Sequence, residues 1–390
     1  MIELKGISVF SGLPVLIKIE GTKISDVREL AESGDANLPF ISPGFLDVQV
    51  NGFNGIDYSL NDLRADQIEV LVLRLAQSGT TKHTPTFVTM PNERLLRNLK
   101  LLVDTMEKNE TVNAGIAGFH IEGPFISSED GPRGAHDKKH TRSPDFSLFE
   151  EWQRAAKGNI KYITLAPELP GSLEFIKAAA KTGVKVSIGH TAASPEQIRE
   201  AIIAGASCST HLGNGSHAQL PRLKNYIWEQ MAADSLWASI ICDSFHLPQP
   251  VVKVISRAKG LQRLFLVSDA ALLGGYKPGL YKWGDIDVEV FADGHLGIPG
   301  TGALAGASHM LDWGIARFME FTGVSLKEAI TLCTIQPARF LGLDTGEYSQ
   351  FISGNSANLC LFSYGPADKQ LRIHQTINNG QTVFDSFIQA

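Results

Sequence analysis

Eight short apolar runs alternate with helical segments between residues 45 and 270 of this chain. The helical segments carry their own end signals: residues 67–79 end at a glycine, and Ser194 and Gln197 have the spacing of a capping box. Apolar strands joined by helices are typical of parallel sheets that are covered on both faces. Eight such units predict an α/β fold, a (β/α)8 TIM barrel. The runs are residues 45–51, 81–88, 115–122, 161–168, 185–190, 208–213, 237–245 and 264–270.

The two chain ends have a different pattern, with short strands separated by turns. We therefore expect residues 1–42 and 350–390 to form one small β-sandwich domain beside a barrel domain of residues 43–349. Residues 304–343 predict two further amphipathic helices. The glycine-rich residues 274–306 predict either a turn-rich loop or a mobile loop that covers the site.

Composition limits the class of protein. Hydrophobic residues make up 43% and charged residues 19% of the 390 residues, which is ordinary for a soluble globular protein. The net charge is −6 and there is no basic run, so we expect no nucleic-acid partner. We find no signal peptide and no apolar stretch long enough for a membrane span, and we expect a cytoplasmic protein. The four cysteines lack C-x-x-C spacing, which favours reduced core thiols.

Four polar residues stand at the carboxyl ends of predicted strands: Glu122, His190, His211 and Asp269. In a barrel these strand ends meet on one face, where catalytic groups cluster. One carboxylate and two imidazoles make a ligand set for a divalent transition metal with one position open for water, and an aspartate beside that water is a candidate general base. Taken singly, each residue could be a helix cap or a core histidine. Together they favour a metal-dependent hydrolase.

Several further residues refine this hypothesis. His136, in the loop after the third strand, is either an oxyanion donor or a solvated histidine. The first strand ends in Gln49-Val50-Asn51, where many barrel hydrolases carry H-x-H for a second metal, and neutral amides are poor ligands. We therefore expect one divalent ion, Zn²⁺ or alternatively Fe²⁺. His83 is expected in the core, and His120 either orients the ligands or packs in the core.

Several strings in this chain occur together in one known family. They include SPGFLDVQVNG (42–52), GFHIEGPF (118–125), RGAH (133–136), IGHT (188–191), THLGN (210–214) and LVSDA (266–270). With these strings the chain resembles the N-acetylglucosamine-6-phosphate deacetylases of the amidohydrolase superfamily. The resemblance implies metal-dependent removal of acetate from a small amino-sugar phosphate, and it suggests a homodimer. It also implies that Glu122, His190 and His211 are the metal ligands, that Asp269 is the acid/base and that His136 polarises the carbonyl.

The loop after the sixth strand departs from the family pattern. Gly215 and Ser216 replace the usual Ala-Met, and His217 has no counterpart. The segment 127–140 is also slightly expanded, which could reshape the mouth of the pocket.

Substrate recognition is expected from four residues. By resemblance, the backbone near Asn214 and Gly215 and the side chains of Arg222 and His246 hold the sugar phosphate. Arg222 could also form an ordinary surface ion pair. The alternatives are a substrate without a phosphate, such as another N-acetyl amino sugar or an N-acyl compound, and a non-catalytic scaffold.

Overall fold

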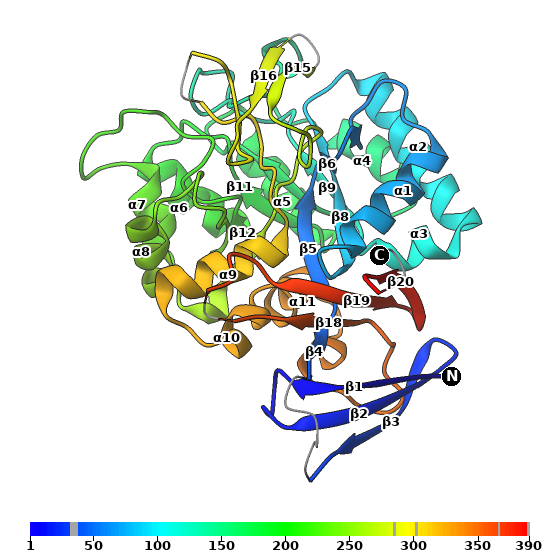
Figure 1. Cartoon of the computed structure of the whole chain (residues 1–390). Coiled ribbons are helices and arrows are strands. Elements are labelled where there is room, and N and C mark those ends of the chain that lie inside the picture. Colours follow the sequence, from blue (N-terminus) through cyan, green and yellow to red (C-terminus); the bar gives the residue numbers. More distant parts are fainter. Residues whose placement is uncertain (32–37, 284–285, 301–302, 366, 388–390) are drawn as a thin grey trace.

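The computed structural model describes residues 1–31, 38–283, 286–300, 303–365 and 367–387, and its centre is an eight-stranded parallel sheet (Figure 1). The sheet closes into a barrel between its first and last strands. There Asp269 N donates to Gln49 O over 3.0 Å, and Asn51 N donates to Ala270 O over 2.9 Å. The predicted (β/α)8 barrel is confirmed. Its strands are β5 (Phe45–Val50), β8 (Thr80–Val88), β9 (Phe119–Glu122), β10 (Ile160–Leu165), β11 (Lys185–Ile188), β12 (Ala206–Ser209), β13 (Trp237–Ile241) and β14 (Leu264–Val267).

Helices surround the barrel because each one buries a single apolar stripe. In α1 (Ala65–Ala76) the buried residues Ile68, Leu71, Val72 and Leu75 follow the helical repeat. The expected capping box of α6 (Pro195–Ala204) is present, and the helix ends at Gly205. The other helices are α2 (Asn92–Lys108), α3 (Glu110–Gly115), α4 (Phe146–Ala155), α5 (Ser172–Lys181), α7 (Tyr226–Ala232), α8 (Gln249–Lys259), α9 (Leu311–Thr322), α10 (Leu326–Thr331), α11 (Ile335–Leu341) and α12 (Gly346–Ser349), with 3-10 turns η1 (Lys138–His140) and η2 (Leu261–Arg263).

Both ends of the chain contribute to a second sheet, with the strand order β20-β19-β18-β4-β1-β2-β3. Its middle strand, β4 (Phe40–Pro43), pairs parallel with β1 (Ile2–Ser8) and antiparallel with β18 (Leu359–Ser363). One apolar cluster joins the two halves of the sheet, so they enclose a common core, as in a sandwich. The predicted small β-domain from both termini is confirmed, and the domain boundaries at 42/43 and 349/350 remain our proposal. The remaining strands are β2 (Pro14–Glu20), β3 (Lys23–Glu29), β19 (Arg372–Asn378) and β20 (Gln381–Asp385).

The described part of the glycine-rich segment holds a three-stranded antiparallel sheet, which the sequence did not predict. Its strands are β15 (Gly279–Trp283), β16 (Ile286–Val290) and β17 (Leu296–Gly297). The sheet has its own small apolar core, which includes Val288, Val290 and Leu296. In Figure 1, β15 and β16 (yellow) rise above the barrel on the side away from the small β-domain.

The structure also bears on the expectations about the cysteines and about membrane-spanning helices. All four cysteines (Cys208, Cys242, Cys333 and Cys360) are buried and free, which confirms the core thiols. Among the described residues, no helix is both long enough and apolar enough to cross a membrane.

A short hairpin after β5 buries the carboxyl group of Asp57. The hairpin pairs β6 (Gly52–Phe53) with β7 (Ile56–Asp57). Asp57 is 2% exposed, its Oδ1 accepts from Ser59 N over 2.7 Å, and its Oδ2 is buried without a partner among the described residues. Burial outweighs these hydrogen bonds and raises the pKa of Asp57 from 3.8 to about 7. The folded protein therefore holds a proton that the unfolded chain loses above about pH 4.

We expect this carboxyl to make the stability of the protein depend on pH. Between pH 3.8 and about 7 the folded state binds more protons at Asp57, so the free energy of unfolding falls as the pH rises through this window. The contribution is at most roughly 4 kcal/mol. Denaturant titrations from pH 4 to pH 8 should show a flatter dependence for Asp57→Asn than for the wild type. Parallel curves for the two proteins would contradict this assignment.

Candidate active site

The four strand-end residues share a buried position at one end of the barrel. Glu122 is the last residue of β9, and His190, His211 and Asp269 lie two residues beyond β11, β12 and β14. Their exposed fractions are 2%, 7%, 3% and 9% in that order. His190, His211 and Asp269 also have positive φ angles of 51°, 30° and 51°, a conformation that is uncommon for residues other than glycine and that clusters at functional sites.

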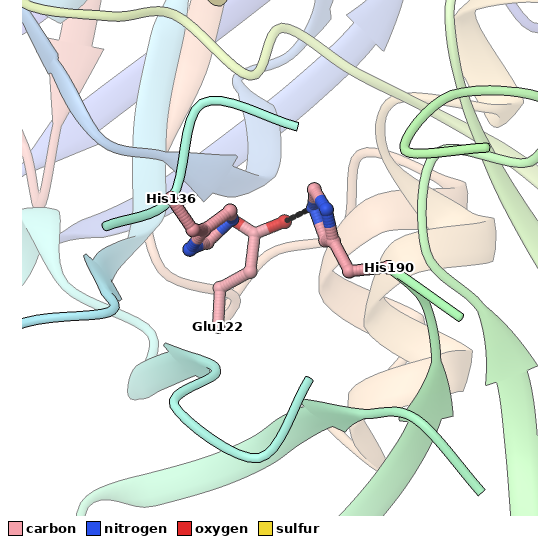
Figure 2. Close-up of side chains that lie close together, drawn as sticks. All are labelled: Glu122, His136 and His190. Carbon is pink, nitrogen blue, oxygen red and sulfur yellow. Dashed lines mark hydrogen bonds and ion pairs between the residues drawn. The ribbon is translucent and has the colours of Figure 1, made fainter. Parts of the chain in front are cut away.

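Three of these side chains converge. Glu122 Oε1 lies 2.9 Å from His211 Nε2 and 3.1 Å from His190 Nε2, and the two Nε2 atoms are 3.2 Å apart. Figure 2 shows Glu122 and His190 pointing toward one another, with His136 beside them. His136 also lies close, because its potential ligand atom is within 4.8 Å of those of Glu122 and His190. Two overlapping sets of three ligands are therefore possible, Glu122 and His190 with either His211 or His136.

The donor set of Glu122, His190 and His211 fits a divalent cation. His190 Nδ1 lies 2.9 Å from the Pro132 carbonyl oxygen, which can only accept, so in the neutral ring the lone pair is on Nε2 and faces the other two ligand atoms. The separations of 2.9–3.2 Å are close to the edge of roughly 3.3 Å that a tetrahedral zinc site has. Burial opposes the charge of Glu122, yet its close contacts with the imidazoles of His190 and His211 hold the pKa of its carboxyl well below the usual value.

His136 has its ring proton on a different nitrogen from His190. Thr89 N donates to its Nδ1 over 3.4 Å, and Thr89 Oγ1 is 2.9 Å from the same atom. Nδ1 is thus an acceptor, and in the neutral ring the proton is on Nε2. Burial, followed by the charge of His190, lowers the pKa of His136 to about 3. The ring is therefore a neutral N–H donor, which suits an oxyanion donor better than a metal ligand.

Asp269 is held by two amides from the end of β5. Its Oδ1 accepts from Asn51 Nδ2 over 2.7 Å and from Gln49 Nε2 over 3.1 Å, and Gln49 Nε2 is also 3.0 Å from Glu122 Oε1. Burial, followed by the charge of Glu122, raises the pKa of Asp269 to about 6. A carboxyl with such a pKa can both accept and release a proton near neutral pH. Sequence reasoning treated Gln49 and Asn51 only as missing ligands and so did not predict these contacts.

Two loops enclose the ring of His190, and glycines are required where they approach it. A Cβ on Gly215 would lie 2.7 Å from His190 Nδ1, and one on Gly134 would lie 3.3 Å from His190 Cε1. Both glycines have positive φ angles, of 57° and 58°. The glycine that replaces the usual alanine after Asn214 therefore has a steric reason in this structure.

We expect Gly215→Ala to displace His190. The added methyl group would clash with the ring, so the affinity for a divalent metal should fall roughly 10–100-fold. Gly183→Ala is a matched control, because Gly183 also has a positive φ of 86° but nothing lies within 4 Å of its Cβ position. It should lose only about 1–2 kcal/mol of stability through backbone strain. Metal titrations of both variants test this, and equal metal affinities would contradict it.

The remaining candidate histidines lie in the barrel core. His120 stacks on Tyr162 with ring centroids 3.7 Å apart, and its nitrogens contact the hydroxyls of Thr86 and Thr164. His83 Nε2 lies 2.7 Å from the hydroxyl of Tyr58. Burial lowers the pKa of both histidines to about 3. Of the two roles left open for His120, the described contacts support core packing.

Comparison with known proteins places this chain in a family. The amidohydrolase family model matches residues 40–383. N-acetylglucosamine-6-phosphate deacetylase of Bos taurus is 33% identical over 81% of this chain and 78% of the bovine protein, and that of Homo sapiens is 30% identical over 96% and 89%. The chain belongs to the N-acetylglucosamine-6-phosphate deacetylase family. An N-acetylgalactosamine-6-phosphate deacetylase of Escherichia coli O157:H7 is also similar, with 27% identity over 87% of both chains.

Solved structures of the family superpose on nearly the whole chain. The deacetylase from Thermotoga maritima has a TM-score of 0.83 at 27% identity and covers 99% of both chains. An aspartate-to-alanine variant of the Mycobacterium smegmatis deacetylase, in complex with N-acetyl-D-glucosamine-6-phosphate, has a TM-score of 0.84 at 25% identity and covers 98% of this chain and 99% of that one. The family is metal-dependent, in keeping with the buried cluster of possible ligands.

The predicted substrate-binding residues differ in whether they lie at the cluster or at the surface. Asn214 turns back toward the cluster, with its N 2.9 Å from His211 O. His246 is oriented by a 2.6 Å contact of its Nδ1 with Asp243 Oδ2. Arg222 is exposed, and the described residues include no partner for its guanidinium. The structure thus brings Asn214 and Gly215 to the cluster but leaves Arg222 at the surface.

Two further side chains, His217 and Glu168, stabilise the loops of the site. His217 Nε2 contacts Glu129 Oε2 over 3.2 Å, and its Nδ1 lies 3.0 Å from the Tyr226 hydroxyl, so it joins the expanded loop 127–140 to the loop after β12. Glu168, at the end of the fourth predicted strand, accepts from Ala192 N over 2.7 Å and from Thr191 Oγ1 over 2.5 Å. It therefore stabilises the loop that follows His190.

Proposed function

We propose that this protein hydrolyses the acetamido group of N-acetylglucosamine 6-phosphate to release acetate. The observation that carries the proposal is the convergence of Glu122, His190 and His211 within 3.2 Å of one another beside Asp269. Membership of the deacetylase family supports the same reaction. Asp269 and its raised pKa add the proton-transfer group that such a hydrolysis requires.

Glu122 Oε1, His190 Nε2 and His211 Nε2 would hold one divalent cation, Zn²⁺ or Fe²⁺. When bound, such an ion lowers the pKa of a coordinated water to about 7 and polarises a carbonyl group. The Pro132 carbonyl keeps the proton of His190 on Nδ1, so that Nε2 is available as a ligand. Gln49 and Asn51 offer neutral amides where a second ion would need stronger ligands, which supports a single ion.

The other two residues would act directly on the reacting amide. Asp269 takes the proton from the attacking water and delivers it to the nitrogen that leaves. His136 donates its Nε2–H to the carbonyl oxygen as negative charge develops there. Because His136 stays neutral, it supplies this hydrogen bond without titrating near neutral pH.

Recognition of the sugar phosphate is proposed for Asn214, Gly215, Arg222 and His246. The two loop residues lie beside His211 and His190, where the acetamido group must sit. The exposed Arg222 could reach a phosphate at the mouth of the site or in a neighbouring subunit, and we propose a homodimer in a cytoplasmic setting.

A substrate panel on the metal-loaded protein tests the proposed function. We expect acetate release to be fastest with N-acetylglucosamine 6-phosphate, slower with N-acetylgalactosamine 6-phosphate and slowest with unphosphorylated N-acetylglucosamine. No release from any member of the panel would refute the proposal.

The exposure of Arg222 favours a second candidate, a substrate without phosphate. Arg222→Ala separates the two candidates, because loss of a uniform phosphate contact raises KM more than it lowers kcat. A variant with unchanged KM for the phosphorylated sugar would favour the unphosphorylated substrate.

A further inference from the structure

The side-chain amides of Gln49 and Asn51 donate hydrogen bonds to the carboxylates of the candidate active site. Gln49 Nε2 is 3.0 Å from Glu122 Oε1 and 3.1 Å from Asp269 Oδ1, and Asn51 Nδ2 is 2.7 Å from the same Asp269 oxygen. Both side chains are buried, with exposed fractions of 0% and 4%. An ionised carboxylate only accepts hydrogen bonds, so the NH₂ group of each amide must face it.

The oxygen atom of each amide has no hydrogen-bond partner among the described residues. Gln49 Oε1 and Asn51 Oδ1 are buried, and neither has a hydrogen-bond donor among the described residues. A buried polar atom without a partner costs about 1–3 kcal/mol. An apolar side chain of the same shape would avoid this cost, so packing alone does not account for amides at these two positions. Their contribution lies in the contacts to the carboxylates.

The same strand end also holds the backbone of Asp269. Asp269 N donates to Gln49 O over 3.0 Å, where β14 closes the barrel against β5. Gln49 and Asn51 therefore fix both the main chain and one carboxylate oxygen of Asp269. Two amide donors on Oδ1 leave Oδ2 as the oxygen that can exchange a proton, and no described residue donates a hydrogen bond to Oδ2.

We propose that Gln49 and Asn51 are positioning residues that hold Oδ1 of Asp269, so that Oδ2 faces the reacting nitrogen and carries the proton to it. Gln49 has a second role, because its amide also holds the carboxylate of Glu122 among the candidate ligands. The neutral amide of Gln49 thus lies between the two carboxylates, and the amide of Asn51 adds a second donor to Asp269. This proposal rests on the proposed deacetylase function.

Two near-isosteric substitutions and one control test the assignment. Asn51→Leu removes a contact to Asp269 alone, whereas Gln49→Met removes contacts to both carboxylates. Gln153→Met is the control, because Gln153 forms two hydrogen bonds with the backbone of Ile160 through its own amide on α4. The measurements are kcat and KM for acetate release, the metal content after dialysis, and the thermal midpoint.

We expect Asn51→Leu to lower kcat roughly 10–100-fold with KM and metal content close to wild type. Gln49→Met should lower kcat and lose metal as well. Each variant removes an unpaired buried oxygen but also leaves a carboxylate oxygen without its amide donor, so we expect only a small change in the thermal midpoint beside the fall in kcat. Gln153→Met should lower the thermal midpoint and leave kcat unchanged. If Asn51→Leu does not fold, Asn51→Ser removes the same contact with a smaller side chain.

A purely structural role would give a different set of results. Wild-type kcat in Asn51→Leu or Asn51→Ser would overturn the proposal, as would a fall in stability with no change in kcat. If the wild-type protein itself releases no acetate, it is the proposed function that fails. In that case, metal loss in Gln49→Met but not in Asn51→Leu still supports the role of Gln49 at Glu122, and equal metal contents overturn it.

Discussion

Asp269→Asn should retain the bound metal and lose almost all acetate release. The asparagine oxygen can still accept from Gln49 and Asn51, so the geometry around Oδ1 persists. The amide cannot take up a proton, and loss of a general acid/base lowers the rate by about 10²–10⁴-fold. The decrease should appear in kcat, with KM close to the wild-type value, in steady-state assays of acetate release.

The matched control for this change is Asp57→Asn. Asp57 is also a buried carboxyl with a raised pKa, but its hydrogen bonds are to Ser59 rather than to the cluster. The kcat of Asp57→Asn should stay at the wild-type value. A kcat for Asp269→Asn within tenfold of the wild type would remove Asp269 from the proton transfer.

Glu122→Gln should abolish both metal binding and activity. Glu122 supplies the one charged ligand atom in the cluster, and its Oε1 contacts both histidine Nε2 atoms. A neutral amide of the same size is a poor ligand for a transition metal. We expect less than about one hundredth of the wild-type kcat/KM, and elemental analysis should find no stoichiometric metal after dialysis.

Glu168→Gln is the control at the neighbouring strand end. In the wild type, the carboxylate of Glu168 accepts hydrogen bonds from Thr191 and Ala192 and does not contact the cluster. This variant should keep its metal while losing some stability. Removing the metal from the wild type with a chelator should reproduce the inactivity of Glu122→Gln, and adding Zn²⁺ should restore activity to the wild type alone. Full metal occupancy in Glu122→Gln would exclude Glu122 as a ligand.

The sequence predicted the barrel and the cluster because both depend on local patterns. Each apolar run overlaps one observed strand, and polar residues follow where the strands end. In a closed parallel barrel all carboxyl ends meet at one rim, so Glu122, His190, His211 and Asp269 had to come close once the topology was correct. The three-stranded sheet over residues 279–297 was not predicted, because its glycines and short strands resemble a loop.

The sequence could not predict the details of the site, because they depend on distances between residues that are far apart in the chain. His217 looked like an unexplained departure, and only its contacts with Glu129 and Tyr226 show that it braces two loops. Arg222 matched a family position in sequence, yet its side chain is exposed at the surface of this chain. Neither outcome follows from residue type or spacing, since both depend on how the loops pack.

The order of strands and helices, and the four polar residues that end the strands, were determined by the sequence itself, because the spacing of apolar residues sets secondary structure locally. Only the tertiary structure decided which atoms face one another: the amide bridge from Gln49 and Asn51, the proton positions on His136 and His190, and the need for glycine at Gly215. These features arise where separate loops meet within about 3 Å, and hydrogen bonds and steric contacts act only over such short distances.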